Sequence, residues 1–108
     1  MERNISPDLI RGHTDTIILR LLCEGDMYGY QIYRKIIQRS LGMYELKEAT
    51  LYSSLRRLEN QSLITSYWGD ESQGGRRKYY RITDEGRRAY GRNRADWEFT
   101  KKVIDMLI

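Results

Sequence analysis

The residues with the most evident chemistry lie in a stretch that reads QGGRRKYYRIT. It contains two glycines followed by three consecutive cations: Gly74, Gly75, Arg76, Arg77 and Lys78. Such cations bind phosphate groups and release their counterions, and glycines let a loop approach another molecule closely. The stretch therefore predicts contact with a polyanion. The alternative is that the cations only keep the exposed edge of a strand soluble.

Positive charge is concentrated around this stretch. The 108 residues carry a net charge of +4, but segment 76–94 alone carries +6, with eight cations against two acids. The rest of the chain is therefore slightly acidic. A local basic stripe of this kind favours a polyanionic partner such as nucleic acid.

Three helices are expected ahead of the basic stretch, because apolar residues recur there at helical spacing. The first is expected from Ser6 to about Gly25, since Ser-Pro-Asp is a typical helix start. The second contains the apolar positions of 32–37 and ends before the glycine at 42. The third is expected over 47–61.

The third helix carries candidate DNA-reading side chains. Leu51, Leu55 and Leu58 recur at i, i+4 and i+7 and are expected to face the core. Hydroxyl groups on the opposite side suit phosphate, and Arg56 suits either phosphate or a guanine edge. The candidate DNA contacts are Thr50, Tyr52, Ser53, Arg56 and Arg57, with Ala49 and Asn60 beside them.

A hairpin and a long helix are expected after the third helix. Side chains alternate over 64–68 and again over 77–82, and turn residues lie between the two segments. Tyr80 and Ile82 are expected to anchor the second strand inward. The last helix is expected from Asp84 to the end of the chain.

This order of elements predicts a mainly α fold with a small β-hairpin. It describes a winged helix-turn-helix over 1–83, in which the third helix enters the major groove and the hairpin wing lies on adjacent backbone. A C-terminal dimerisation helix over 84–108 completes one compact unit.

Other function classes find little support. No apolar run approaches the ~20 residues of a membrane span and no leader pattern opens the chain, so we expect a soluble, cytoplasmic protein. The single cysteine, Cys23, is expected to be a buried thiol, and the single histidine, His13, an ordinary polar position. Without a metal-ligand cluster or a catalytic motif, we expect no enzyme, no metal and no cofactor.

The last helix is expected to form a homodimer, because it is apolar on two nearly opposite sides. One side carries Tyr90, Trp97, Ile104 and Ile108, and the other carries Ala95, Phe99, Val103 and Met106. The expected interface residues are Trp97, Phe99, Val103, Ile104, Met106 and Leu107. Two-fold symmetry predicts recognition helices ~34 Å apart and a roughly palindromic operator. Packing of the last helix within one chain is the alternative.

Three segments carry a resemblance to a known family. "MYGYQI" at 27–32, "EATLYSSLRRLENQSLI" at 48–64 and "GGRRKYYRITDEG" at 74–86 resemble the PadR family of bacterial transcriptional repressors in order and spacing. The stretch "SYWGDESQGGRRKYYRIT", with Trp97 in the last helix, is most similar to the small multidrug-responsive members. The resemblance implies a repressor of transcription.

The same resemblance implies a ligand site at the dimer interface. Trp97 resembles the tryptophan that stacks planar aromatic drugs in those relatives, and a ligand bound there would relieve operator binding. The residues expected around it are Leu9, Asp15, Arg94 and Lys101. The two cations among them predict a bias toward neutral or anionic planar compounds, which Asp15 and Asp96 would partly compensate.

Three alternatives remain open at this point. The winged helix could act only as a protein-interaction module, the protein could bind DNA without responding to ligands, and Trp97 could be a purely structural residue of the interface.

Overall fold

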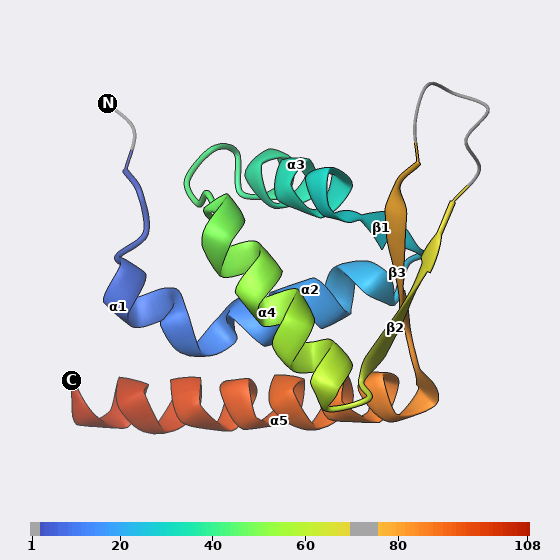
Figure 1. Ribbon diagram of the computed structural model, residues 1–108. Helices are drawn as coiled ribbons and strands as arrows, with labels where there is room; N and C mark the ends of the chain where they lie inside the picture. Colours follow the sequence, from blue (N-terminus) through green and yellow to red (C-terminus); the bar gives the residue numbers. More distant parts are fainter. Residues whose placement is uncertain (1–2, 70–75) are drawn as a thin grey trace.

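The computed structural model of the protein describes residues 3–69 and 76–108 (Figure 1). The N-terminal part forms α1 (Pro7–Ile10), a 3-10 turn η1 (Arg11–His13) and α2 (Thr14–Leu22). The expected single helix from Ser6 to Gly25 is therefore wrong. The chain tightens into η1 around Gly12, a residue of low helix propensity, and the side chain of Ser6 caps no helical N–H.

The helix-turn-helix consists of α3 (Gly29–Arg39) and α4 (Glu48–Asn60). The third helix expected over 47–61 is confirmed, with its leucines 51, 55 and 58 each about 1% exposed. The turn between the helices uses left-handed backbone at Leu41 and Gly42. In Figure 1 α4 crosses in front of α2, and residues of the two helices are in contact.

A three-stranded antiparallel sheet forms the wing. Its order is β1 (Met27–Tyr28), β3 (Lys78–Ile82) and β2 (Ile64–Trp68). The expected hairpin is confirmed, but β1 was not predicted, because two residues are too few to show alternation. The register pairs Met27 with Tyr80 and Tyr28 with Tyr79, so β1 anchors the start of α3 to the wing.

The last helix, α5 (Asp84–Leu107), follows β3 directly and extends along the underside of α2 and α4 in Figure 1. Thr83 caps it: its hydroxyl oxygen accepts a hydrogen bond from the Gly86 N–H at 2.9 Å. Gly86 and Ala89 are the buried residues of this helix. No helix in the described ranges 3–69 and 76–108 is long and apolar enough to cross a membrane.

One apolar core joins α2, α3, α4, the sheet and α5. Ile18, Leu19 and Leu22 of α2 lie at its centre and are almost fully buried. The other members come from α3, α4, the sheet and the first turns of α5: Ile32, Ile36, Leu51, Leu55, Leu58, Ile64, Tyr80, Ile82 and Ala89. The core therefore fixes α4 and the wing relative to each other.

Candidate nucleic-acid interface

The outer face of α4 is exposed, as expected for a helix that enters a DNA groove. Ala49, Ser53, Arg56 and Asn60 lie opposite the buried leucines and are all exposed. No hydrogen bond or ion pair holds the Arg56 guanidinium within the described residues, so its donors are available to a partner. Thr50 is also exposed, at the edge of this face.

Tyr52 occupies the flank of α4 that faces α3. Its ring lies directly on Gly29, the first residue of α3, where an added Cβ would collide with the phenol. The close approach requires glycine at this position. Tyr52 is therefore held by the start of α3 and presents only part of its ring to the outer face.

Arg57 occupies the flank of α4 that faces α2. Its guanidinium donates two hydrogen bonds to the carboxylate of Asp15, at 3.0 and 2.7 Å, and one to the Oγ of Ser54 at 3.1 Å. This fork geometry is the strong form of an Arg–carboxylate pair. Of the two adjacent arginines, Arg57 braces α4 against α2, whereas Arg56 faces outward.

The inner face of the wing continues the outer face of α4. Ser66 pairs with Tyr80 across the hairpin and Trp68 pairs with Lys78, so all four side chains lie on one face of the sheet. The Ser66 hydroxyl donates a hydrogen bond to Glu59 of α4. Tyr80 is buried, as expected, and the Lys78 ammonium lies 5.7 Å from the centre of its ring.

The outer face of the wing carries a row of aromatic rings. Tyr28, Tyr79 and Tyr67 are cross-strand neighbours; Tyr79 meets Tyr28 edge to face at 5.5 Å and stacks on Tyr67 at 5.7 Å. Arg77 lies over the Tyr28 ring and Arg81 over the Tyr67 ring. The three consecutive cations of the wing therefore divide: Arg77 lies with this row, whereas its two neighbours lie with Trp68 and Tyr80 on the inner face.

Asp26 fastens the wing to the loop that follows α2. Its carboxylate accepts hydrogen bonds from the Tyr67 hydroxyl at 2.6 Å and from Arg81 at 3.0 Å. Burial raises the pKa of Asp26, but these two hydrogen bonds and the positive charge of Arg81 together lower it by more, so its pKa lies below the ordinary value. These contacts hold the wing in one position relative to the end of α2. Gly74 and Gly75, the expected tip of the wing, lie outside the described residues.

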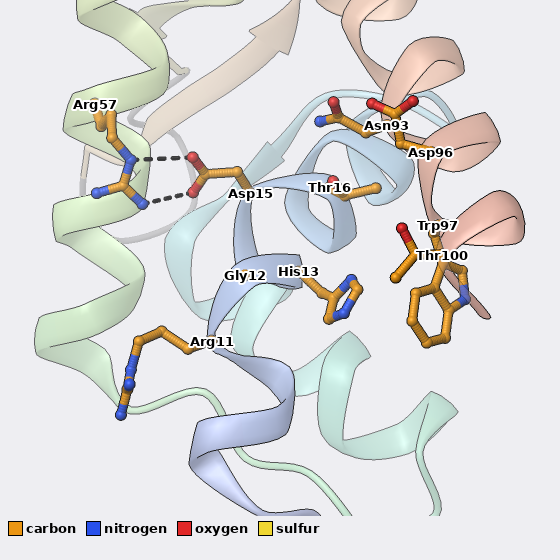
Figure 2. Close-up of a pocket in the computed structure, with 10 residues that line it drawn as sticks. All are labelled: Arg11, Gly12, His13, Asp15, Thr16, Arg57, Asn93, Asp96, Trp97 and Thr100. Atoms are coloured by element: carbon orange, nitrogen blue, oxygen red, sulfur yellow. Dashed lines mark hydrogen bonds and ion pairs between the residues drawn. The ribbon is translucent and has the colours of Figure 1, made fainter. Parts of the chain in front are cut away.

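A cavity of about 420 Å³ lies behind α4, between η1, the start of α2 and α5 (Figure 2). Figure 2 shows the Asp15–Arg57 pair on one side and Trp97 with Thr100 on the other. Trp97 is 37% exposed and meets the edge of the His13 ring, with the ring centres 4.6 Å apart. The residues around the cavity are Arg11, Gly12, His13, Asp15, Thr16, Arg57, Asn93, Asp96, Trp97 and Thr100.

Only two of the five expected ligand residues border this cavity. Asp15 and Trp97 do, whereas Leu9 is 76% exposed on α1, and Arg94 and Lys101 are not part of the lining. Both of these cations form ion pairs with Glu98, at 3.3 and 3.4 Å. Lys101 also lies 5.7 Å from the centre of the Trp97 ring. Glu98 therefore offsets one of the two positive charges expected beside Trp97.

The C-terminal half of α5 is an exposed apolar surface. Phe99 is 67% exposed and Leu107 is 77% exposed, while Val103 is half-buried. The two expected apolar sides are thus both open from about residue 99 onward. The interface expected on these residues stays a prediction for an assembled form.

Three positions proved more informative than the sequence suggested. His13 packs on Trp97, Glu98 forms ion pairs with both neighbouring cations, and Trp68 is exposed beside wing cations. The i+4 spacing from Arg94 to Glu98 was the one available signal among these. Cys23 is a half-buried free thiol, and within 3–69 and 76–108 no group of acidic, histidine or cysteine side chains is suited to a metal.

Comparison with known proteins gives a consistent result. Residues 18–92 match the model of the transcriptional regulator PadR-like family. The chain is 45% identical over 104 residues to "Uncharacterized protein X" of Lysinibacillus sphaericus, covering 96% of this chain and 95% of that protein. It is 30% identical to transcriptional regulator YqjI of Escherichia coli, of which it spans 43%.

Solved structures of similar fold extend this comparison. A transcriptional regulator from Clostridium thermocellum is 50% identical and superposes with a TM-score of 0.87, covering 94% of this chain and 98% of that one. A PadR family transcription regulator from Clostridium difficile is 40% identical with a TM-score of 0.78, covering 88% and 97%. The expected winged helix-turn-helix with a long C-terminal helix is confirmed by this likeness.

Proposed function

Since the chain belongs to the PadR-like family of DNA-binding transcriptional regulators, which are not enzymes, we propose that it represses transcription as a homodimer on a roughly palindromic operator. The observation that carries the proposal is the continuity of two exposed surfaces. The outer face of α4, with Arg56, leads onto the inner face of the wing, with Lys78 and Arg76. A groove-reading helix beside a cationic strand is the arrangement that winged-helix proteins use on duplex DNA.

In this proposal α4 reads bases and the wing holds phosphates. Ala49 allows close approach to the groove floor, Ser53 suits phosphate or base, and Arg56 suits the O6 and N7 acceptors of guanine. The bidentate Asp15–Arg57 pair holds the angle of α4 against α2. Arg57 then contributes to DNA binding mainly by orienting the helix.

The homodimer forms through the exposed apolar half of α5. Phe99, Met106 and Leu107 are each at least two-thirds exposed, which is unusual for large apolar side chains that lie close together on one helix. A second copy of the chain covers them under a two-fold axis. The winged part over 1–83 and the helix over 84–108 remain one unit in each protomer.

Planar aromatic compounds relieve repression by binding beside Trp97. The partly exposed indole and the polar cavity next to it supply a stacking surface and hydrogen-bonding groups. Because Glu98 pairs with both Arg94 and Lys101, the bias against cationic compounds is weaker than the sequence suggested. A ligand there shifts the equilibrium between DNA-binding and free arrangements of the dimer.

Selection from a pool of random duplexes tests the DNA part of this proposal. The wild-type protein is expected to enrich a palindromic sequence, and Arg56→Ala to lose preference at individual positions, by roughly 1–3 kcal/mol per base pair. Arg88→Ala removes an arginine from α5 and is the matched control. A chain that binds no duplex DNA at low salt would instead support the protein-interaction alternative.

Sedimentation and fluorescence test the other two parts. A chain truncated before Ala95 is expected to be a monomer with greatly weakened operator affinity, because linked half-sites gain effective concentration. An unchanged dimer would place the interface elsewhere.

Titration with one cationic and one anionic planar compound is expected to quench the fluorescence of Trp97. A Trp97→Ala chain gives the background signal of Trp68. Equal quenching of both chains would favour a ligand-insensitive regulator.

A further inference from the structure

Trp68 is an exposed tryptophan whose position the fold does not require. It is the last residue of β2 and is 57% exposed, beyond the part of the sheet that covers the core. A tryptophan stabilises a fold mainly through its burial, so a half-exposed indole at the end of a strand contributes little to the free energy of folding. Tyrosine and tryptophan at such exposed positions are typical of binding surfaces.

Two cations flank the indole. The Arg76 guanidinium lies 4.7 Å from the centre of the Trp68 ring, and Lys78 is its direct cross-strand partner. A guanidinium over an aromatic ring is attracted by the negative charge of the ring face. The indole therefore stacks on one cation and neighbours the other, whose ammonium lies over the Tyr80 ring on the same face.

This cluster lies on the face of the wing that continues α4. Trp68 and Ser66 alternate with Tyr67 along β2, so they share one face, and Ser66 is hydrogen-bonded to Glu59 of α4. The aromatic row of Tyr28, Tyr79 and Tyr67 lies on the opposite face. A partner that runs along α4 therefore meets Trp68 before it meets any ring of that row.

We propose that Trp68 is a contact to the backbone of duplex DNA, with its ring packed on a deoxyribose and the adjacent phosphates bound by Arg76 and Lys78. Both cations lie on the same face of the wing as the indole, so a strand whose sugar packs on the ring has positive charge near its phosphates. The proposal rests on the DNA-binding function above and adds a contact that is apolar and independent of sequence. An indole held this way contributes to affinity and leaves base specificity to α4.

The salt dependence separates the indole from the cations. Trp68→Ala is expected to weaken binding to a mixed-sequence duplex about tenfold without changing the slope of log affinity against log salt, because no phosphate contact is lost. Arg76→Ala is expected to lower that slope by about 0.9. Trp68→Phe keeps a ring on the inner face and is expected to retain most of the affinity.

Fluorescence tests the contact without relying on the stability of the alanine variant. In Trp97→Phe the only tryptophan is Trp68, and its emission is expected to change when the mixed-sequence duplex is added. Tyr67→Phe, on the opposite face of the same strand, is the control and is expected to bind as the wild type does.

Each outcome has one meaning. Duplex binding with unchanged Trp68 emission and wild-type affinity of Trp68→Ala would overturn the contact while leaving the DNA-binding function in place. An emission change with single-stranded poly(dT) but none with duplex would also overturn it, in favour of base stacking. Failure of the wild-type chain to bind any duplex would remove the proposed function together with the contact.

Discussion

Two glycines of α5 give a sharp test of how the wing is joined to that helix. Gly86 is buried in the first turn, and an added Cβ would collide with the carbonyl oxygen of Leu63, with the carbonyl carbon 3.1 Å and Ile82 Cγ1 2.7 Å away. Gly91 lies on the same helix, and an added Cβ there would meet nothing within 4 Å. We expect Gly86→Ala to destabilise the fold and Gly91→Ala to stabilise it.

The magnitudes follow from these surroundings. Alanine in a helix interior is favoured over glycine by about 0.5–1 kcal/mol, which is the whole expected gain for Gly91→Ala. Gly86→Ala starts from the same gain but collides with backbone, which cannot rotate away as a side chain can. Overpacking costs about 1–3 kcal/mol, and displacement of the Thr83 cap adds about 1 kcal/mol. The net loss is about 2–3 kcal/mol.

Thermal unfolding followed by circular dichroism measures both effects. For a domain near this size 1 kcal/mol corresponds to about 4–8 °C, so Gly91→Ala is expected to raise Tm by a few degrees and Gly86→Ala to lower it by about 10 °C or more. Both variants must be compared with wild type at one protein concentration, because association makes Tm depend on concentration. Equal Tm values for the two variants would refute the claim that α5 is fixed by backbone contact at Leu63.

Three further expectations concern the wing and α4. Asp15→Asn frees Arg57 and is expected to steepen the slope of log affinity against log salt by about 0.9. Little stability is expected to be lost, since the pair is half-exposed. An unchanged slope would show that Arg57 reaches no phosphate. The lowered pKa of Asp26 stabilises the fold above its ordinary pKa of about 4 and ceases to do so as pH falls through the folded value. Unfolding free energies of wild type and Asp26→Asn are therefore expected to converge as the pH falls below about 4, and a constant gap would contradict this sign. Gly29→Ala is expected to displace Tyr52 and to weaken operator binding clearly, with only a small loss of Tm. Gel shifts and thermal melts of the same variant measure the two effects, and normal DNA affinity would show that the position of the Tyr52 ring does not matter.

Most of the fold could be predicted because its main signals are periodic. Leu51, Leu55 and Leu58 defined α4, and alternation defined the hairpin with Tyr80 inward. The N-terminal helix was predicted as continuous because Gly12 is compatible with a helix in sequence terms. In the structure the chain tightens into η1 around Gly12, and Thr14 directly after it is buried in the core.

The candidate interface was only partly predictable, because residue spacing shows on which face of a helix a side chain lies but not which neighbouring element it contacts. Helical geometry placed Arg56 and Arg57 on one exposed side, and only the position of α2 separates their roles. The same limit applies to the wing, where adjacent cations were treated as one group. The structure shows instead that the Arg77 guanidinium lies over the ring of Tyr28, which pairs with Tyr79 on the outer face of the wing.

The continuity of α5 makes it a lever between the wing and the far end of the molecule. Its 24 residues form one helix about 36 Å long that begins directly after β3 and is buried near Ala89. With Ala89 as the fulcrum, the arm toward Ile108 is about 28 Å and the arm toward Thr83 about 9 Å. A tilt of about 10° moves the exposed end by roughly 5 Å and the base of the wing by roughly 1.5 Å in the opposite direction. A partner that packed on the exposed end and tilted α5 about Ala89 would therefore move the base of the wing by about a third of the distance that it moved the exposed end.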